Sequence, residues 1–262
     1  MTKTILVTGA TDGIGLLTAK KLAADGHRIL IHGRNATKLE TARKDVGGEV
    51  ETYRADLSDM SEVASLAAAI RANHDRLDVL INNAGVLKAP QPVLENGYDI
   101  RFVVNTFAPY LLTELLLPIM PKTGRVVNLS SAAQAPVDLS AMTGKKRLSD
   151  MDAYAQSKLA ITIWTREWAK SLPEGPAMIA VNPGSLLASK MVKDGFGVAG
   201  NDLNIGADIL IDAALGDRFS NASGAYFDND GGVFSDPHSA AFNIDHATDL
   251  MSTLQAIIRQ QS

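Results

Sequence analysis

Tyr154 and Lys158 are four positions apart, which places both side chains on one face of a predicted helix. A tyrosine with a pKa near 10 is a weak acid and a weaker base at neutral pH unless a nearby cation stabilises the phenolate. At about 4–6 Å and an effective dielectric constant of about 20, that attraction is on the order of 3–4 kcal/mol, or roughly two pKa units. The pair therefore predicts that Lys158 lowers the pKa of Tyr154 into the range used for acid–base catalysis. A solvated helical pair with no catalytic role has the same spacing.

A glycine-rich turn follows the first apolar run, where the sequence reads Thr8-Gly9-Ala10-Thr11-Asp12-Gly13-Ile14-Gly15 before a helical pattern begins. Glycine lets the backbone turn tightly and approach a pyrophosphate, whose charge is favoured by the free N–H groups and the dipole of the helix. The G-x-x-x-G-x-G spacing differs from the G-x-G-x-x-G dinucleotide fingerprint, and a purely structural turn is the alternative. Cofactor contacts are predicted from Gly9, Thr11, Asp12, Gly13, Ile14 and Gly15.

The second predicted strand ends in Ile31-His32-Gly33-Arg34, where an NAD-specific enzyme carries a carboxylate for the ribose 2′-hydroxyl. No carboxylate is present, and Arg34 offers instead a guanidinium fork that matches a 2′-phosphate. This predicts NADP(H) in preference to NAD(H), with an arginine that only opens a surface loop as the alternative. Further cofactor contacts are predicted in the same crevice, from the ends of the third and fourth strands: Asp56, Leu57, Asn82, Ala84 and Gly85.

Short runs rich in Val and Ile alternate with longer helical patterns, which is typical of βαβ units around a parallel sheet. Strands are predicted at Thr4–Thr8, Arg28–His32, Glu49–Arg54, Val79–Asn82, Arg125–Leu129, Ala177–Val181 and Ala225–Phe227. Helices are predicted at Ile14–Asp25 (capped by Gly26), Ala36–Val46, Met60–Ala72, Tyr98–Met120, Asp152–Leu172, Ile205–Leu215 and Ala247–Ile258. Right-handed crossovers then give one Rossmann-type domain over residues 1–262, a doubly wound parallel sheet of about seven strands with helices on both faces.

The composition excludes several kinds of protein. With 46% hydrophobic and 21% charged residues, the chain can build a sizeable core, and it shows no linker or internal repeat. A net charge of −4 gives no electrostatic reason to bind nucleic acid or an anionic membrane. The absence of cysteine excludes thiolate sites, and the five histidines form no close pair that would predict a metal site. Because no apolar stretch matches a signal peptide or a membrane span, we expect a cytoplasmic protein without a membrane anchor.

The chemical motifs occur together in the order and spacing of the short-chain dehydrogenase/reductase family, which the chain resembles from Thr4 to about Gly232. They are the glycine turn, Asn82-Asn83-Ala84-Gly85, Ser130-Ser131, Tyr154-Ala155-Gln156-Ser157-Lys158 and Asn182-Pro183-Gly184. The resemblance implies that Tyr154 is the general acid/base, and that Lys158 holds the nicotinamide ribose and lowers the tyrosine pKa. It also implies a set of further roles: Ser131 binds the substrate oxygen, Asn105 helps to hold a water in a proton relay, and Pro183 and Gly184 join Tyr154 and Lys158 in lining the cofactor.

Two departures from the family pattern stand out. Ser131 and Tyr154 are 23 positions apart, longer than the commonest spacing, which predicts extra residues around Asp138–Asp150 and is most similar to the retinol-dehydrogenase and WW-domain-oxidoreductase branch. Because such an insertion lies near surfaces that other members use for oligomer contacts, both a monomer and a homo-oligomer stay open. Ala188 stands where a hydroxyl usually helps to hold the nicotinamide carboxamide, and Ser189 follows it. Either the register shifts by one residue or that contact is lost.

The segment from about 185 to 205 is predicted to be a mobile lid over the substrate. It combines three glycines with Met191, Val192, Phe196 and Val198, which makes it too glycine-rich for a stable helix although its apolar groups need cover. A lid above the nicotinamide would exclude water and favour apolar substrates. A surface loop that completes the core is the alternative.

These patterns together predict an NADP(H)-dependent oxidoreductase that moves a hydride between the nicotinamide and an apolar small-molecule carbonyl or alcohol. A non-catalytic NADP(H)-binding regulator on the same fold is one alternative, against which the intact set of Asn105, Ser131, Tyr154 and Lys158 argues. An epimerase or dehydratase is another, although such proteins usually carry a larger C-terminal substrate domain than the roughly thirty residues that follow Gly232.

Overall fold

The computed structural model describes residues 1–261, with the backbone alone at Phe196, and contains one eight-stranded sheet in the order β3-β2-β1-β4-β5-β6-β7-β8. The strands are β1 (Thr4–Val7), β2 (Arg28–Gly33), β3 (Val50–Arg54), β4 (Val79–Asn82), β5 (Arg125–Leu129), β6 (Ala177–Asn182), β7 (Tyr226–Asp228) and β8 (Val233–Ser235). Strands β1 to β7 are parallel and β8 is antiparallel. All seven predicted strands are confirmed to within one residue at each end. Strand β8 was missed because its three exposed residues show no alternation.

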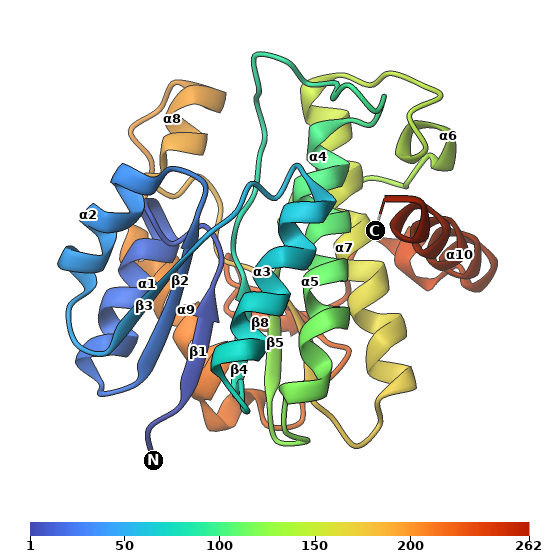
Figure 1. The fold of residues 1–262 in the computed structure, drawn as a ribbon. Helices are drawn as coiled ribbons and strands as arrows, with labels where there is room; N and C mark the ends of the chain where they lie inside the picture. The colour runs from blue at the N-terminus through green and yellow to red at the C-terminus, as the bar shows by residue number, and fades with distance from the viewer. Residues whose placement is uncertain (262) are drawn as a thin grey trace.

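Helices cover both faces of the sheet (Figure 1). One face carries α1 (Gly13–Ala24), α2 (Ala36–Val46) and α9 (Leu203–Leu215), and the other carries α3 (Met60–Asn73), α5 (Ala108–Leu116) and α7 (Asp150–Ser171), with α10 (Ile244–Gln261) packed outside α7 and α3. The short elements are α4 (Ile100–Phe102), α6 (Leu139–Met142), α8 (Lys190–Phe196) and the 3-10 turns at Leu117–Ile119, Asp217–Phe219 and Ser239–Phe242. The doubly wound fold class is therefore confirmed, as is the Gly26 cap, whose φ is 82°.

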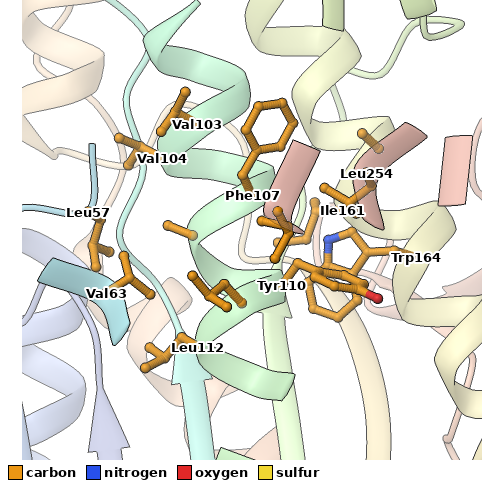
Figure 2. Close-up of a cluster of buried hydrophobic side chains, with 14 of the residues drawn as sticks. Leu57, Val63, Val103, Val104, Phe107, Tyr110, Leu112, Ile161, Trp164 and Leu254 are labelled. Atoms are coloured by element: carbon orange, nitrogen blue, oxygen red, sulfur yellow. The ribbon is translucent and has the colours of Figure 1, made fainter. Parts of the chain in front are cut away.

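Each face of the sheet has its own core because alternate strand residues point in opposite directions. In β1, Ile5 and Val7 belong to the cluster under α1 and α9, whereas Leu6 belongs to the cluster under α3, α5 and α7. Figure 2 shows part of the second cluster, in which Tyr110 and Trp164 meet edge to face at 5.7 Å between ring centroids. Because helices cover both faces of the sheet, we expect a ligand to bind at the edge where the carboxyl ends of the parallel strands lie.

The helix predicted over Tyr98–Met120 is divided into α4, a π-helical turn η1 (Val103–Phe107), α5 and a 3-10 turn. The Ala108 N–H donates to the Val103 carbonyl, five residues back. Because Pro109 has no N–H, the Asn105 carbonyl lacks the donor that an α-helix would give it. Single π-turns of this kind are frequent at functional sites.

The prediction that no apolar stretch matches a membrane span was wrong, because by length and composition alone the helical stretch Ile100–Ile119 would be able to cross a membrane. In the fold, 72% of its apolar window is buried. Figure 2 shows Phe107, Tyr110 and Leu112 of this stretch inside the core. Its hydropathy therefore matches that of a helix packed in the interior of the fold.

The prediction that the lid segment is too glycine-rich for a helix was wrong, because residues 190–196 form α8. Ser189 caps this helix by accepting a hydrogen bond from the Val192 N–H at 3.3 Å. Gly197 ends it in the left-handed conformation with a φ of 68°. Capping at both ends and packing against the rest of the fold outweigh the intrinsic cost of Gly195.

Candidate active site

The glycine turn after β1 lies so close to the loop after β4 that larger residues would collide. A Cβ on Gly9 would be 2.9 Å from Ala84 Cα, and a Cβ on Gly15 would be 2.4 Å from Asn83 Nδ2. Gly9 and Gly13 also adopt φ values of 65° and 55°, which other residues rarely adopt. The turn is therefore a cradle in which the backbone itself can approach an anionic ligand at the N-terminus of α1.

Asn83, which belongs to the predicted Asn82–Gly85 motif, and His32, which was not predicted as a site residue, hold this turn in place. Asn83 Nδ2 donates to the carbonyls of Thr8 and Gly9 at 2.8 and 3.1 Å. The Gly9 N–H donates to His32 Nδ1 at 3.2 Å, and His32 Nε2 lies 3.0 Å from the Ala55 carbonyl. Burial lowers the pKa of His32, so the ring is neutral and carries its proton on Nε2. The only sequence signal was the position of His32 at a strand end beside the turn.

The remaining predicted residues of the turn lie at the start of α1. Asp12 caps the helix by accepting a hydrogen bond from the Gly13 N–H at 2.8 Å. Thr11 lies against the end of β2, where a Cβ on Gly33 would be 2.4 Å from Thr11 Cγ2. Ile14 packs toward α9. A side chain at position 33, where NAD-specific enzymes carry a carboxylate, would therefore require Thr11 to move.

Arg34 lies exposed directly after β2. The next residue, Asn35, caps α2 by accepting a hydrogen bond from the Lys38 N–H at 2.9 Å. Within residues 1–261, no hydrogen bond or ion pair engages the Arg34 guanidinium. A guanidinium without a protein partner beside a helix N-terminus is well suited to bind a phosphate.

The other predicted cofactor contacts, at the strand ends, differ in which of their groups a ligand could reach. Asp56 is half-buried, and its Oδ1 accepts from the N–H and hydroxyl of Ser58 at 2.9 and 2.7 Å. Leu57 is buried in the core that Figure 2 shows. Asn82 Nδ2 donates to Asn128 Oδ1 at 2.8 Å inside the sheet. Leu57 and Asn82 can therefore offer a ligand only backbone groups.

The four predicted catalytic side chains converge near the ends of β4 and β5. Lys158 Nζ lies 5.7 Å from the centroid of the Tyr154 ring, and Ser131 is hydrogen-bonded to Tyr154. A Cβ on Gly85 would be 3.4 Å from Asn105 Oδ1 and 3.6 Å from Lys158 Nζ. The structure thus brings together residues from three separate stretches of sequence, and Gly85 stands at the point where the cofactor crevice meets them.

Hydrogen bonds of Asn105 connect the π-helical turn to the loop after β4 and to α7. Its Oδ1 accepts from the Val86 N–H at 2.8 Å, and its Nδ2 donates to the Val86 carbonyl and to Ser157 Oγ at 2.9 Å each. Thr106 Oγ1 donates to the Ser157 carbonyl at 3.0 Å. Both Nδ2 protons of Asn105 are used, and its backbone carbonyl, to which Pro109 offers no N–H, is an acceptor that would suit a relay water.

The prediction that Lys158 lowers the pKa of Tyr154 is wrong in this structure. Burial raises the pKa of Tyr154, and only the hydrogen bond with Ser131 opposes it. Lys158 Nζ donates to the Leu129 carbonyl at 2.7 Å, and burial lowers the pKa of Lys158 itself to about 8. The Coulomb argument failed because it ignored desolvation, which acts against the charged forms of both residues.

The insertion predicted around Asp138–Asp150 is anchored beside the site by a buried arginine that the sequence did not single out. The side chain of Arg101 is 2% exposed, and its Nε donates to Asp99 Oδ1 at 2.7 Å. The same guanidinium pairs with Asp150, the first residue of α7. Arg101 is one turn before Asn105, and Asp150 is one turn before Tyr154, so this ion pair joins the helical segment that carries Asn105 to α7, which carries Tyr154.

Pro183 and Gly184, which follow β6, are held by the turn between β7 and β8. Asn229 Nδ2 donates to the Pro183 carbonyl at 2.9 Å, and Asp230 Oδ1 accepts from the Ser185 N–H at 2.7 Å. Although this turn is acidic, no three His, Asp or Glu side chains among the described residues are arranged to hold a metal ion. The aspartates instead fix the path of the backbone toward the lid.

The lid segment lies over the cofactor crevice. Ser189 Cβ is 3.7 Å from the position of a Cβ on Gly13, and Met191 Cε is 3.6 Å from that of a Cβ on Gly85. Helix α8 therefore approaches both the glycine turn and the catalytic side chains. The base of the segment is closed by hydrogen bonds that pair Leu186 and Ala188 with Asn201 at 2.6 and 2.7 Å.

Ala188 and Ser189 lie at the start of this lid. The Ala188 side chain has no hydroxyl, whereas the Ser189 hydroxyl accepts from Val192 and keeps its own proton free to donate. A shift of one residue would thus preserve the nicotinamide contact that the family pattern implies.

Comparison with known proteins agrees with this geometry. Residues 3–196 match the family model described as short chain dehydrogenase. Retinol dehydrogenase 13 from Homo sapiens is 38% identical over 193 residues, which span 70% of this chain and 58% of that protein. Retinol dehydrogenase 12 from Mus musculus is 34% identical over 244 residues, which span 86% of this chain and 77% of that protein.

Solved structures give the same result for the fold. An uncharacterized protein from Mycobacterium Paratuberculosis superposes with a TM-score of 0.83 at 28% identity, over 98% of this chain and 93% of that one. A metagenomic short-chain oxidoreductase in complex with NADP superposes with a TM-score of 0.62 at 31% identity, over 80% of this chain and 89% of that one.

Proposed function

Because the chain belongs to the short-chain dehydrogenase family of oxidoreductases, we propose that it interconverts carbonyl and alcohol groups of apolar small molecules with NADP(H). The observation that carries the proposal is the convergence of Ser131, Tyr154, Lys158 and Asn105 beside a glycine cradle. A regulator that only bound a dinucleotide would have no need of a half-buried proton donor next to a hydroxyl.

The fit of a nicotinamide dinucleotide is supported by the shape of the crevice. Gly9 and Gly15 let the turn pack closely against the loop after β4, and the position of a Cβ on Gly13 meets only Ser189 Cβ of the lid segment, at 3.7 Å. Arg34 has no protein partner among the described residues, and Gly33 at the end of β2 carries no carboxylate. Both features favour a cofactor with a 2′-phosphate. The bound cofactor would supply or accept the hydride.

The protein's own groups would handle the oxygen and the proton. Ser131 would donate a hydrogen bond to the substrate oxygen, and Tyr154 would give its proton to the same atom as negative charge develops there. Because burial raises the pKa of Tyr154, the phenol is protonated at neutral pH. That state suits carbonyl reduction, in which Tyr154 must begin as an acid.

An apolar substrate is supported by the lid and by the relatives. Met191 and Val192 of α8 are half-buried against the crevice, and Leu87 packs below the same helix, where a Cβ on Gly195 would be 2.7 Å from Leu87 Cδ2. The relatives include retinol dehydrogenases and the Homo sapiens polyprenol dehydrogenase, which is 35% identical over 195 residues. Both names denote long apolar alcohols.

The test is transfer of deuterium from nicotinamide-labelled NADPH to a panel of medium-sized apolar aldehydes and ketones, with sugar phosphates as the charged comparison. We expect label in the alcohol product, one oxidised cofactor per product, and higher kcat/KM for the apolar compounds. A chain that binds NADPH tightly but labels no member of the panel would be the non-catalytic regulator instead.

Two further predictions from the sequence concern the cell rather than the site. A cytoplasmic location without a membrane anchor stays a prediction, which fractionation of cells that express the tagged chain would test. The oligomeric state likewise awaits light scattering of the purified protein.

A further inference from the structure

We propose that Tyr226 and Gln134 are positioning residues that set the catalytic hydroxyl of Ser131 by jointly holding its backbone carbonyl. The kinetic consequence rests on the function proposed above, whereas the structural consequence does not. Tyr226 belongs to β7 and Gln134 to the irregular segment after β5.

The Ser131 carbonyl accepts two hydrogen bonds. Tyr226 Oη donates to it at 3.1 Å, and Gln134 Nε2 donates to it at 2.9 Å. A carbonyl oxygen has two lone pairs, so both are used. Tyr226 is 5% exposed, and burial also raises its pKa, so its hydroxyl stays a donor throughout the pH range of an enzyme.

The placement of the Ser131 hydroxyl depends on this carbonyl because no regular structure holds the segment. Residues 130–138 lie outside any helix or strand. The Ser131 hydroxyl accepts from the Ala133 N–H at 3.1 Å and is hydrogen-bonded to Tyr154. Rotation of the peptide that follows Ser131 would therefore break one of these bonds and move the hydroxyl away from the substrate oxygen.

Gln134 extends this arrangement to the C-terminal part of the chain. Its Oε1 accepts from the His238 N–H at 2.9 Å, and its Nε2 also lies 3.3 Å from Ser130 Oγ. Tyr226 and His238 both lie beyond residues 3–196, which the family model matches. The C-terminal part thus does more than cover the core, since two of its groups reach the segment that carries the catalytic serine.

The kinetic test uses Tyr226→Phe, which removes one hydroxyl and keeps the ring. We expect kcat for the best carbonyl substrate to fall about tenfold, the size of one hydrogen bond, with the Kd for NADPH unchanged within about twofold. In a Ser131→Ala background the same change should have no further effect, because Tyr226 acts through Ser131. Equal losses in both backgrounds, or none in either, would overturn the inference.

The matched control is Tyr53→Phe. Tyr53 is 8% exposed, and its hydroxyl donates to Glu51 at 3.1 Å in β3, at the opposite edge of the sheet. This variant loses the same atom from a buried, hydrogen-bonded tyrosine and should keep kcat.

Amide hydrogen exchange tests the same inference without any substrate. Tyr226→Phe and Gln134→Ala should each speed exchange in peptides that cover residues 130–136, and Tyr53→Phe should not. Unchanged protection of that segment in both variants would overturn the inference even if the enzyme is active. Loss of protection in a chain that reduces no carbonyl compound would instead leave the positioning intact and overturn the proposed function.

Discussion

The cofactor crevice and the substrate side of the site are built in different ways. Around the glycine turn, the backbone is fixed by contacts that tolerate no added atom, as at Gly9 and Gly15, and by side chains such as Asn83 that bond directly to it. On the substrate side, the irregular segment 130–138 and the start of the lid segment are held by side-chain hydrogen bonds from residues far away in sequence, such as Tyr226 and Asp230.

The difference teaches which parts of the site can change without loss of the fold. A cradle made of backbone and glycines serves one ligand shape, because Gly9 and Gly15 lie in close contact with the atoms of neighbouring residues. Segments held by a few side-chain bonds can be altered one bond at a time. We therefore expect the cofactor half to be rigid in its specificity and the substrate half to be adjustable.

The largest effect is expected at Tyr154, where the two halves meet. Tyr154→Phe removes the proton donor and should lower kcat by a factor of about 10² or more, as for other positioned acid–base groups. The Kd for NADPH should stay within a few-fold, because the phenol does not hold the phosphates. Stopped-flow or steady-state rates together with a fluorescence titration of NADPH measure both. Wild-type turnover in this variant would remove Tyr154 from the mechanism.

The second effect concerns the free energy of unfolding, which burial of the Lys158 ammonium lowers. Lys158 is 4% exposed. Its pKa is about 8 in the fold and about 10.4 in the unfolded chain, so the unfolded chain binds more protons between these values. Stability from this residue therefore rises with pH through that window, and the penalty below pH 8 is about 3 kcal/mol. Without cofactor, Lys158→Met should be more stable than the wild type at pH 7.

Urea unfolding at pH 7 and at pH 10 measures this gap, which should shrink by most of its size at the higher pH. Lys170→Met is the matched control, because Lys170 lies exposed on the same helix and pairs with Glu167. A gap between Lys158→Met and the wild type that is the same at both pH values would show that desolvation of the ammonium is not its cause.

A third prediction confines a change to the cofactor half. Arg34→Ala should lower the ratio of kcat/KM for NADPH to that for NADH by about tenfold or more, because a charge-assisted bond to the 2′-phosphate is lost. Activity with NADH should hardly change. Arg43→Ala removes the same charge from an exposed arginine of α2 that pairs with Glu40, and it should leave the ratio unaltered. Equal efficiency with both cofactors in the wild type would contradict the assignment of Arg34.

The sequence predicted the sheet well because its strands are short Val- and Ile-rich runs, and it predicted that Tyr154 and Lys158 share a helix and that Ser131 follows a strand because helical spacing and strand ends are local features. It failed where the outcome depends on partners distant in the chain. The bond from Tyr226 to Ser131 spans 95 residues, and no local pattern announces it. The π-turn at Asn105 and the pKa directions of Tyr154 and Lys158 depend on packing and burial, which spacing alone does not reveal.

The smallest effect is expected in the lid. It tests most directly whether the cofactor half and the substrate half of the site are separate. Met191 is half-buried, and its Cε lies 3.6 Å from the position of a Cβ on Gly85, which is itself 3.6 Å from Lys158 Nζ. Met191→Ala removes apolar surface above the substrate without touching the glycine turn. We expect KM for apolar carbonyl compounds to rise about three- to fivefold, with kcat and the Kd for NADPH nearly unchanged.

Met251→Ala is the control, because Met251 is also half-buried but packs on α10 against the core. Met251→Ala should change the free energy of unfolding and leave KM unchanged. If Met191→Ala instead weakened NADPH binding as much as it raised KM, the lid would be part of the cofactor cradle. The division between a rigid cofactor half and an adjustable substrate half would then fail at this helix, since α8 would serve the ligand that the glycine turn already holds.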